Sequence, residues 1–106
     1  METFVLVRLD GAALLWSGRR LTARDAAPLY RVLQELAAEG AAPIVVDLTA
    51  VPAVGEGPTA VLAACVAQLG RAGRGMVLCL PGTVPITVCE GHQVRGALRR
   101  AYPTVA

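Results

Sequence analysis

The chain has 106 residues, of which 55% are hydrophobic and 17% are charged. This length fits one domain, residues 1–106, and the apolar content is sufficient for a single core. A net charge of +2 is too small to indicate binding to nucleic acid or to an anionic membrane.

The sequence shows no feature of export or of membrane insertion. No apolar run reaches the length of about 18 residues that suggests a membrane span. The amino terminus has neither the basic start nor the small-residue cleavage site of a signal peptide. The three cysteines, Cys65, Cys79 and Cys89, have spacings that match no zinc or disulfide pattern. We therefore expect a cytoplasmic protein without a membrane span.

The chain begins with a predicted hairpin. Residues 3–11 and 12–18 read as two extended segments. They meet at Asp10-Gly11, a dipeptide that is typical of hairpin turns.

Residues 21–40 predict the first helix, which Gly40 ends. Two starting points are open. Thr22 is one candidate cap, because Asp25 follows three residues later as in a capping box. Asp25 itself is the other, and Pro28 favours it because a later start makes the missing N–H of proline harmless. The apolar stripe expected to face the core is Ala26, Leu29, Tyr30, Leu33, Leu36 and Ala37.

The middle of the chain predicts a β–α–β unit. Residues 42–51 are a continuous apolar and β-branched run, typical of a strand that is buried on both faces. Residues 59–73 form a helix that is apolar nearly all round, and residues 75–82 form the next buried strand. The two strands are expected to run parallel with a right-handed crossover.

The last part of the chain is less regular. Residues 82–92 fit a loop, a short strand or the beginning of a helix, and residues 92–102 predict a helix. Its apolar side is Val94, Ala97, Leu98 and Ala101, while Arg95, Arg99 and Arg100 are expected on a solvated face. The elements together predict an α/β fold: a single-domain mixed sheet of about four to five strands with an N-terminal hairpin and flanking helices.

The order of these elements and several short motifs resemble the STAS domain, the family of bacterial anti-sigma factor antagonists and sulfate-transporter tails. Residues 14–36, 44–82 and 93–106 carry the resemblance. The last segment is similar to the family's third helix and a following short strand. The final helix of the family would begin near residue 106, so we expect it to be missing or very short.

The resemblance implies a regulatory domain that binds other proteins. In the family, Asp-Leu-Ser is followed by Asp-Ser-x-Gly-Leu at the start of the second helix, where an anti-sigma factor kinase phosphorylates the Ser. Here residues 47–49, Asp-Leu-Thr, match the first part. Gly55 and Glu56 stand in the places of the second Asp and the phosphorylatable Ser, and Pro58 and Thr59 stand in those of the Gly and Leu.

Glu56, in this phosphoacceptor register, has two interpretations. As a carboxylate at a helix start it supplies about half the charge of phosphoserine, and so imitates the phosphorylated state permanently. Alternatively, it only caps the helix. Gly55 and Gly57 relieve the limits on backbone φ, and Pro58 suits the first helical position. Thr59 is a candidate replacement phosphoacceptor, although a hydroxyl there more commonly bonds the backbone of the first turn.

No group of residues predicts a catalytic site, a metal site or a cofactor. Cys89 and His92 lie three residues apart, which is weak support for a nucleophilic pair or, with Glu90, for a metal site. Asp47 ends a strand, as a catalytic acid can, but the resemblance gives it the role of shaping the loop before the second helix.

We therefore expect a non-catalytic, cytoplasmic regulatory domain that binds a protein partner, which by the resemblance is an anti-sigma factor serine kinase. The expected partner-binding loop is Asp47, Gly55, Glu56, Gly57, Pro58 and Thr59. Two other functions stay open: a scaffold or transporter-associated subunit, and a small apolar ligand bound or converted in a pocket near Cys89 and His92. A homodimer formed through the apolar surface is compatible with each.

Overall fold

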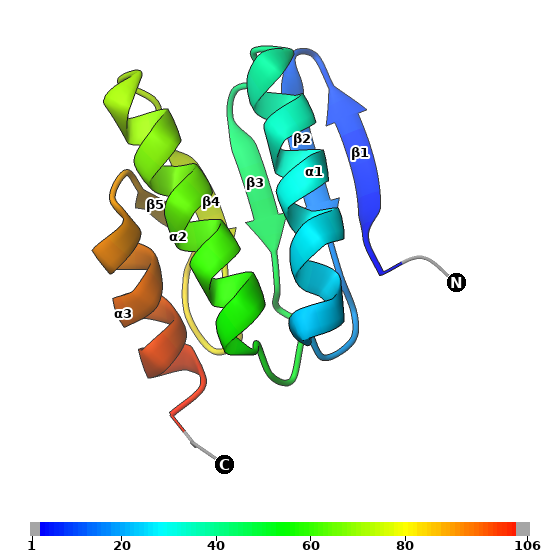
Figure 1. Ribbon diagram of the computed structural model, residues 1–106, viewed down its shortest axis with the longest axis vertical. Coiled ribbons are helices and arrows are strands. Elements are labelled where there is room, and N and C mark those ends of the chain that lie inside the picture. Colours follow the sequence, from blue (N-terminus) through cyan, green and yellow to red (C-terminus); the bar gives the residue numbers. More distant parts are fainter. Residues whose placement is uncertain (1–2, 104–106) are drawn as a thin grey trace.

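Nine elements follow one another in the computed structural model, which describes residues 3–103. In chain order they are β1 (Val5–Leu9), β2 (Ala12–Trp16), the 3₁₀ turn η1 (Ala23–Asp25), α1 (Ala26–Ala38), β3 (Ile44–Asp47), α2 (Glu56–Arg71), β4 (Met76–Cys79), β5 (Ile86–Val88) and α3 (Gly91–Ala101) (Figure 1). The short strand implied near the end of the chain falls on residues 104–106, outside the described residues.

The strands form one mixed sheet in the order β1-β2-β3-β4-β5. β1 and β2 are an antiparallel hairpin, and Asp10 and Gly11 in its turn have φ values of 47° and 85°. Positive φ at both positions gives the primed turn that matches the twist of the strands. β2, β3 and β4 run parallel, whereas β5 is antiparallel to β4. The predicted hairpin, the predicted parallel strands and the α/β class are confirmed, and residues 86–88 of the open segment form a strand.

The three α-helices lie on the same face of the sheet (Figure 1). α2 lies between α1 and α3 and packs against both. The helices and the sheet face beneath them enclose the core, whose largest buried side chains are Leu15, Leu21, Leu29, Leu33, Leu36, Ile44, Val46, Leu48, Leu62, Met76, Leu78 and Leu80. Each such side chain contributes about 1.5–3 kcal/mol when it leaves water, so this contact between the layers is the main source of stability.

The first helix begins in two steps, at the two expected positions, although the Asp25 side chain makes no cap hydrogen bond to α1. Thr22 and Asp25 form a capping box around η1, in which the Thr22 N–H donates to Oδ2 of Asp25 at 2.7 Å. α1 then continues from Ala26, with Pro28 in its first turn. Gly40 adopts a φ of 76° and ends the helix as predicted.

Tyr30 is the member of the predicted apolar stripe that does not face the core. Its side chain is 49% exposed, whereas Leu29, Leu33 and Leu36 are fully buried. Helical spacing puts Tyr30 at the border of the stripe, and a tyrosine there can keep its hydroxyl in water while its ring covers a neighbour. The expectation that Tyr30 belongs to the core was wrong.

The opposite face of the sheet bears none of the helices that the structure describes (Figure 1). Side chains alternate between the two faces along each strand, and residues that pair directly across neighbouring strands point to the same face. One such set of paired residues belongs to the face without helices. They are Val5, Val7, Leu9, Ala12, Leu14, Trp16, Val45, Asp47, Val77, Cys79 and Thr87, and all are exposed or half-buried. We call this set the open face.

Within residues 3–103, none of the helices combines the length and the apolarity that crossing a bilayer requires.

Candidate functional site

The residues expected to form the partner-binding loop lie together at the start of α2, with one exception. Gly55 is the N-cap and Glu56 is the first helical residue. The helix therefore begins at Glu56 rather than at the predicted Thr59, and Pro58 is in the first turn but not at its first position. The Thr59 hydroxyl donates to the Gly55 carbonyl at 2.9 Å, which is the backbone bond expected for it.

The two glycines serve close packing rather than an unusual backbone. Gly55 is extended, with φ −73° and ψ 171°, which any residue can adopt. A Cβ at Gly55 would lie 3.3 Å from the Leu21 carbonyl oxygen, and one at Gly57 would lie 3.4 Å from Cβ of Ala26. The expectation that these glycines relieve φ was wrong: they let the start of α2 approach the segment that leads into α1.

A parallel β-bridge between Leu21 and Val54 holds this approach in place. The Leu21 N–H donates to the Ala53 carbonyl at 3.0 Å, and the Gly55 N–H donates to the Leu21 carbonyl at 2.9 Å. The connection from β3 to α2 is thereby fixed on both sides of Val54. Glu56 follows a backbone that is already positioned before any partner arrives.

Glu56 forms an ion pair with Arg95 of α3. Nη1 of Arg95 donates to Oε1 of Glu56 at 2.8 Å, and the two side chains are 77% and 42% exposed for Glu56 and Arg95. The carboxylate also faces the positive end of the α2 dipole. Its charge is therefore balanced from two directions while its surface stays accessible to another molecule.

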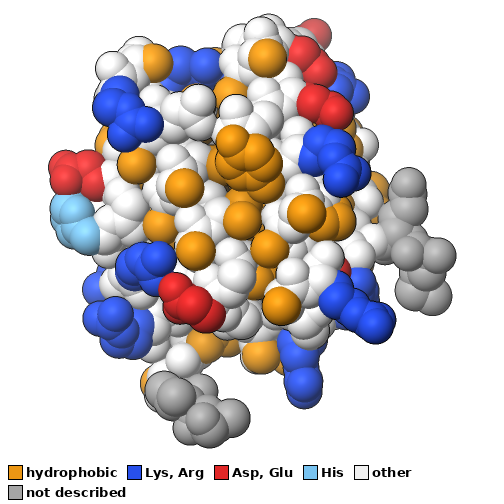
Figure 2. All heavy atoms as spheres, in the orientation of Figure 1, with side chains coloured by type: hydrophobic (Ala, Val, Ile, Leu, Met, Phe, Trp, Pro, Cys, Tyr) orange, Lys and Arg blue, Asp and Glu red, His pale blue; other side chains and the backbone are white. Residues whose placement is uncertain are grey.

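An open cleft of about 670 Å³ adjoins this ion pair. Its lining comes from the segment before η1, the connection into α2 and the outer part of α3: Arg20, Leu21, Thr22, Ala53, Val54, Gly55, Glu56, Thr59, Arg95, Leu98, Arg99 and Tyr102. Figure 2 shows basic and acidic side chains side by side in this region, at the lower left of the molecule. With three arginines against one glutamate, the cleft carries positive charge and an apolar floor.

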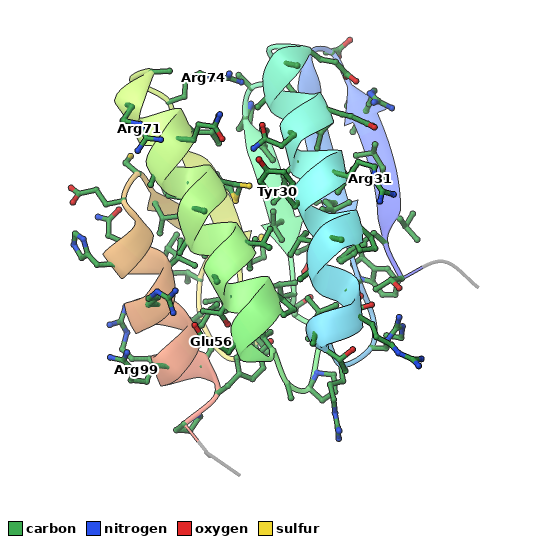
Figure 3. The ribbon with its side chains drawn as sticks, in the orientation of Figure 1. Tyr30, Arg31, Glu56, Arg71, Arg74 and Arg99 are labelled. Atoms are coloured by element: carbon green, nitrogen blue, oxygen red, sulfur yellow. The ribbon has the colours of Figure 1, made fainter. Side chains whose placement is uncertain are left out.

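The surface beside the start of α2 is apolar. Tyr30 projects from α1 toward α2, while Glu56 lies at the lower end of α2 (Figure 3). Figure 2 shows hydrophobic side chains gathered in the middle of this face, over α1 and α2. On α2 itself Ala64 is exposed and Ala60 is half-buried. Exposed aromatic side chains such as that of Tyr30 are enriched in protein-binding surfaces.

Asp47 is the exception among the predicted loop residues, because its side chain belongs to the open face. Its Oδ1 accepts hydrogen bonds from the Thr49 N–H at 3.0 Å and from the Thr49 hydroxyl at 2.6 Å. This closes a tight turn directly after β3. Asp47 thus shapes the first residues of the connection to α2, but it does not join Glu56 in one site.

Tyr102 ties the end of α3 to the same connection. Its hydroxyl donates to the Val51 carbonyl at 2.8 Å, and the Leu48 carbonyl lies 3.3 Å away. Burial raises the pKa of Tyr102 to about 12, so the hydroxyl keeps its proton at physiological pH. This bond fixes α3, and with it Arg95, relative to the chain that enters α2.

Cys89 and His92 lie at the start of α3, and no hydrogen bond joins their side chains within residues 3–103. Cys89 precedes α3 and is exposed, and its N–H donates to Oε1 of Gln93 at 2.7 Å. His92 lies on the surface with its Nδ1 3.3 Å from Oε2 of Glu90. In the part of the chain that the structure describes, no three His, Cys, Asp or Glu side chains are grouped as metal ligands. The cleft of about 670 Å³ at the start of α2 is lined by neither Cys89 nor His92.

Three residues of this region were not predicted from the sequence: Tyr30 as a surface residue, Arg95 as the partner of Glu56, and Tyr102 as an anchor. Arg95 and Glu56 are 39 residues apart, and nothing local connects them. Tyr102 carried a weak signal, since a tyrosine at the end of an apolar helix face usually needs a partner for its hydroxyl. No model of a known protein family matches the chain, and no curated protein sequence matches it.

Proposed function

We propose that this chain is a non-catalytic regulatory domain that binds a protein partner through the start of α2. The proposed surface consists of residues 55–59, the first turns of α2 and Tyr30. The observation that carries the proposal is the position of Glu56: an accessible acid, 77% exposed, on a rigid helix start next to an apolar surface and a basic cleft. Such a rigid surface with one aromatic side chain and a polar border fits a protein better than a small substrate.

The resemblance to STAS domains makes this proposal more specific. On that basis the partner is an anti-sigma factor serine kinase or a protein like it, and both proteins work in the cytoplasm. Glu56 stands where such a kinase would phosphorylate a serine, and a kinase cannot phosphorylate glutamate. The domain is then held in the state that corresponds to phosphorylation. In the family this state breaks the complex with the kinase, so wild type should bind an ordinary anti-sigma factor weakly, and another partner has to be considered.

The ion pair with Arg95 supports the fixed-phosphate interpretation of Glu56. A phosphoserine at the start of a helix is stabilised by the helix dipole and by nearby arginines. Glu56 has both of these neighbours, since it is the first residue of α2 and Arg95 lies 2.8 Å away. The alternative interpretation, that Glu56 caps the helix, does not fit, because Gly55 is the N-cap and no described side chain makes a cap hydrogen bond at this helix start. Glu56 contributes there only through the helix dipole.

A capture experiment tests the proposal. The wild-type domain, Glu56→Ser and Glu56→Ala are used as baits in an extract of the native cells, and captured proteins and phosphosites are identified by mass spectrometry. Glu35→Ser is the matched control, because Glu35 is an exposed glutamate on α1 and lies outside the proposed surface. We expect the Ser variant to capture an ATPase of the kinase class more strongly than wild type and to be phosphorylated at position 56.

The same experiment can reject the proposal. If Glu56→Ser and Glu56→Ala capture kinases no better than wild type, Glu56 is not a fixed phosphate. Tyr30→Ala tests the proposed binding surface separately from the role of Glu56. Removing an aromatic anchor should weaken capture of the true partner about tenfold or more. A partner that is captured equally by all variants binds another surface, and the start of α2 is then not the binding site.

A further inference from the structure

The helices leave the open face of the sheet uncovered, and most of its side chains are apolar. Of its eleven members, Asp47 alone is charged, and it holds no basic residue. The middle row across the sheet is Val7, Leu14, Val45 and Val77, paired strand by strand. A globular domain that places aliphatic side chains in a continuous row on a bare sheet normally covers that row with another surface.

The exposure is greatest over the hairpin. Leu9 is 64% exposed, Val5 47%, Val7 40% and Trp16 39%. β1 is also the edge of the sheet, and its outer side has no strand beside it among the described residues. The hairpin therefore presents its most exposed apolar side chains at one margin of the face, and the half-buried valines of β3 and β4 continue them inward.

Trp16 is held in a fixed position on this face. A Cβ added at Gly18 would overlap the indole ring, so the ring lies directly over the Gly18 backbone. The sheet hydrogen bonds fix the rest of the face in the same way. A preformed, rigid apolar surface loses little conformational entropy when it binds.

We propose that the open face is the interface of a homodimer, in which the sheets of two copies pack face to face. Sheets pack at about 10 Å through interdigitated apolar side chains, as in β-sandwiches, and a flat aliphatic face of this kind is complementary to itself. The charge of +2 per chain gives little repulsion between two copies. A nucleic acid or an acidic protein would need basic groups on this face, and it has none.

The size of the face fits a dimer that dissociates on dilution. Five strands of this length cover about 20 by 15 Å, which is the apolar centre of an interface. The strands alone thus cover about 300 Å², less than the roughly 800 Å² per partner of a standard interface. The broad side of the molecule, on which the face lies, extends 37 × 31 Å, so the loops around the strands can supply the remaining contact area. We therefore expect a weak dimer.

The only charge on the face is placed where a dimer tolerates it. Asp47 is the last residue of β3, at the margin of the face, and its carboxylate is already bonded to Thr49. When the facing strands of two copies run in opposite directions, each Asp47 lies over the other end of its partner's sheet. The two carboxylates then do not meet.

This proposal is independent of the function proposed above, because the start of α2 lies in the helix layer on the other side of the sheet. Its test uses the single tryptophan of the chain. Sedimentation and Trp16 fluorescence are measured together over a dilution series from millimolar to submicromolar. We expect a dimer at high concentration, with Trp16 emission shifted to shorter wavelength and shielded from an aqueous quencher.

Val7→Lys and Ala38→Lys are the paired variants, since both residues are exposed and neither belongs to the core or to the proposed surface at the start of α2. Val7→Lys should weaken dimerisation at least about tenfold, because two ammonium groups lose water in the interface. Ala38→Lys, at the end of α1 on the helix side, should dimerise like wild type. Circular dichroism confirms that both variants are folded.

Three results would overturn the proposal. The wild type could remain a monomer throughout the series. It could form a dimer that Val7→Lys leaves unchanged and that does not alter Trp16 emission, which would place the interface elsewhere. Finally, Trp16 emission could shift on phosphatidylcholine vesicles but not on self-association, which would show that the face binds lipid instead.

Discussion

Arg95 of α3 and Glu56 of α2 form an ion pair of 2.8 Å across the boundary between the two helices. The Glu56 side chain is largely in solvent and that of Arg95 is partly exposed, so salt and water screen the attraction. A double-mutant cycle with Glu56→Gln and Arg95→Gln should therefore give a coupling free energy below about 1 kcal/mol, falling as salt is added. Urea unfolding measures it. A coupling well above that value would mean that the pair is a structural clamp and is not available to a partner.

Tyr102→Phe should destabilise the domain by about 1 kcal/mol, because the variant loses the hydrogen bond to the Val51 carbonyl and keeps the ring. Urea unfolding of the two proteins gives the difference. Tyr30→Phe is the matched control, since the Tyr30 side chain is 49% exposed, and it should change stability by less than about 0.5 kcal/mol. Equal effects of the two substitutions would contradict the anchoring role of Tyr102.

Stability at alkaline pH should depend on the same hydroxyl. The pKa of Tyr102 is about 12 in the folded chain, against about 10 for an unfolded tyrosine. Because the folded state holds the proton more tightly, this contribution is complete below pH about 10 and is lost as pH rises toward about 12. Urea midpoints measured from about pH 8 to about pH 12 should fall more steeply for wild type than for Tyr102→Phe. Parallel curves would refute the assignment.

Asp25 should control part of the acid sensitivity. Burial raises its pKa, but the Thr22 N–H, the Arg19 guanidinium and the hydroxyls of Thr22 and Thr3 outweigh burial and hold the pKa below its usual value. The stabilisation is then present above the unfolded pKa, about 4, and is lost as pH falls through the folded one. Asp25→Asn should lower stability by about 1–2 kcal/mol at neutral pH and flatten the acid decline.

Asp10→Asn is a matched control for this substitution, because asparagine also accepts the positive φ of the hairpin turn. Urea midpoints from neutral to strongly acidic pH should follow wild type in this variant. If Asp25→Asn loses stability to the same extent at every pH, the carboxylate acts through shape and not through its charge.

Ser17→Ala should leave stability unchanged or increase it by up to about 1 kcal/mol. The Ser17 hydroxyl is buried, and it has no hydrogen-bond partner within the described part of the chain. Removing an unpaired polar group from the core eliminates a desolvation cost. Thermal and urea unfolding check the sign, and a loss above about 1 kcal/mol would show that the hydroxyl has a partner after all.

The fold was predictable where local chemistry dictates the backbone. Asp10-Gly11 needs positive φ at both positions, and the aliphatic runs around Val46 and Leu78 are typical of strands. The expectation of burial on both faces was wrong, because helices cover only one face and the side chains of β3 and β4 alternate between buried and half-buried. β5 could not be recognised, because the three residues from Ile86 to Val88 are too few to show a period.

The sequence predicts which segment forms the site, but not the contacts of that segment with other elements. The position of Glu56 at a helix start follows from its neighbours in sequence. Its pairing with Arg95 depends on how α3 packs on α2, and Asp47 points away because a strand alternates its side chains. Tyr30 was misplaced because periodicity alone does not distinguish the centre of an apolar stripe from its border.

The β-bridge between Leu21 and Val54 has a consequence for recognition. It joins the segment that enters α1 to the segment that enters α2 through backbone hydrogen bonds. The two connections therefore form one hydrogen-bonded unit instead of two independent loops. A partner that docks at Glu56 meets a surface whose backbone needs no ordering, and it loses little of its binding free energy to that step. Leu21 and its neighbour Thr22 also link Gly55 to the buried carboxylate of Asp25 through two hydrogen bonds. The start of α2 and the capping box before α1 are therefore parts of this same unit.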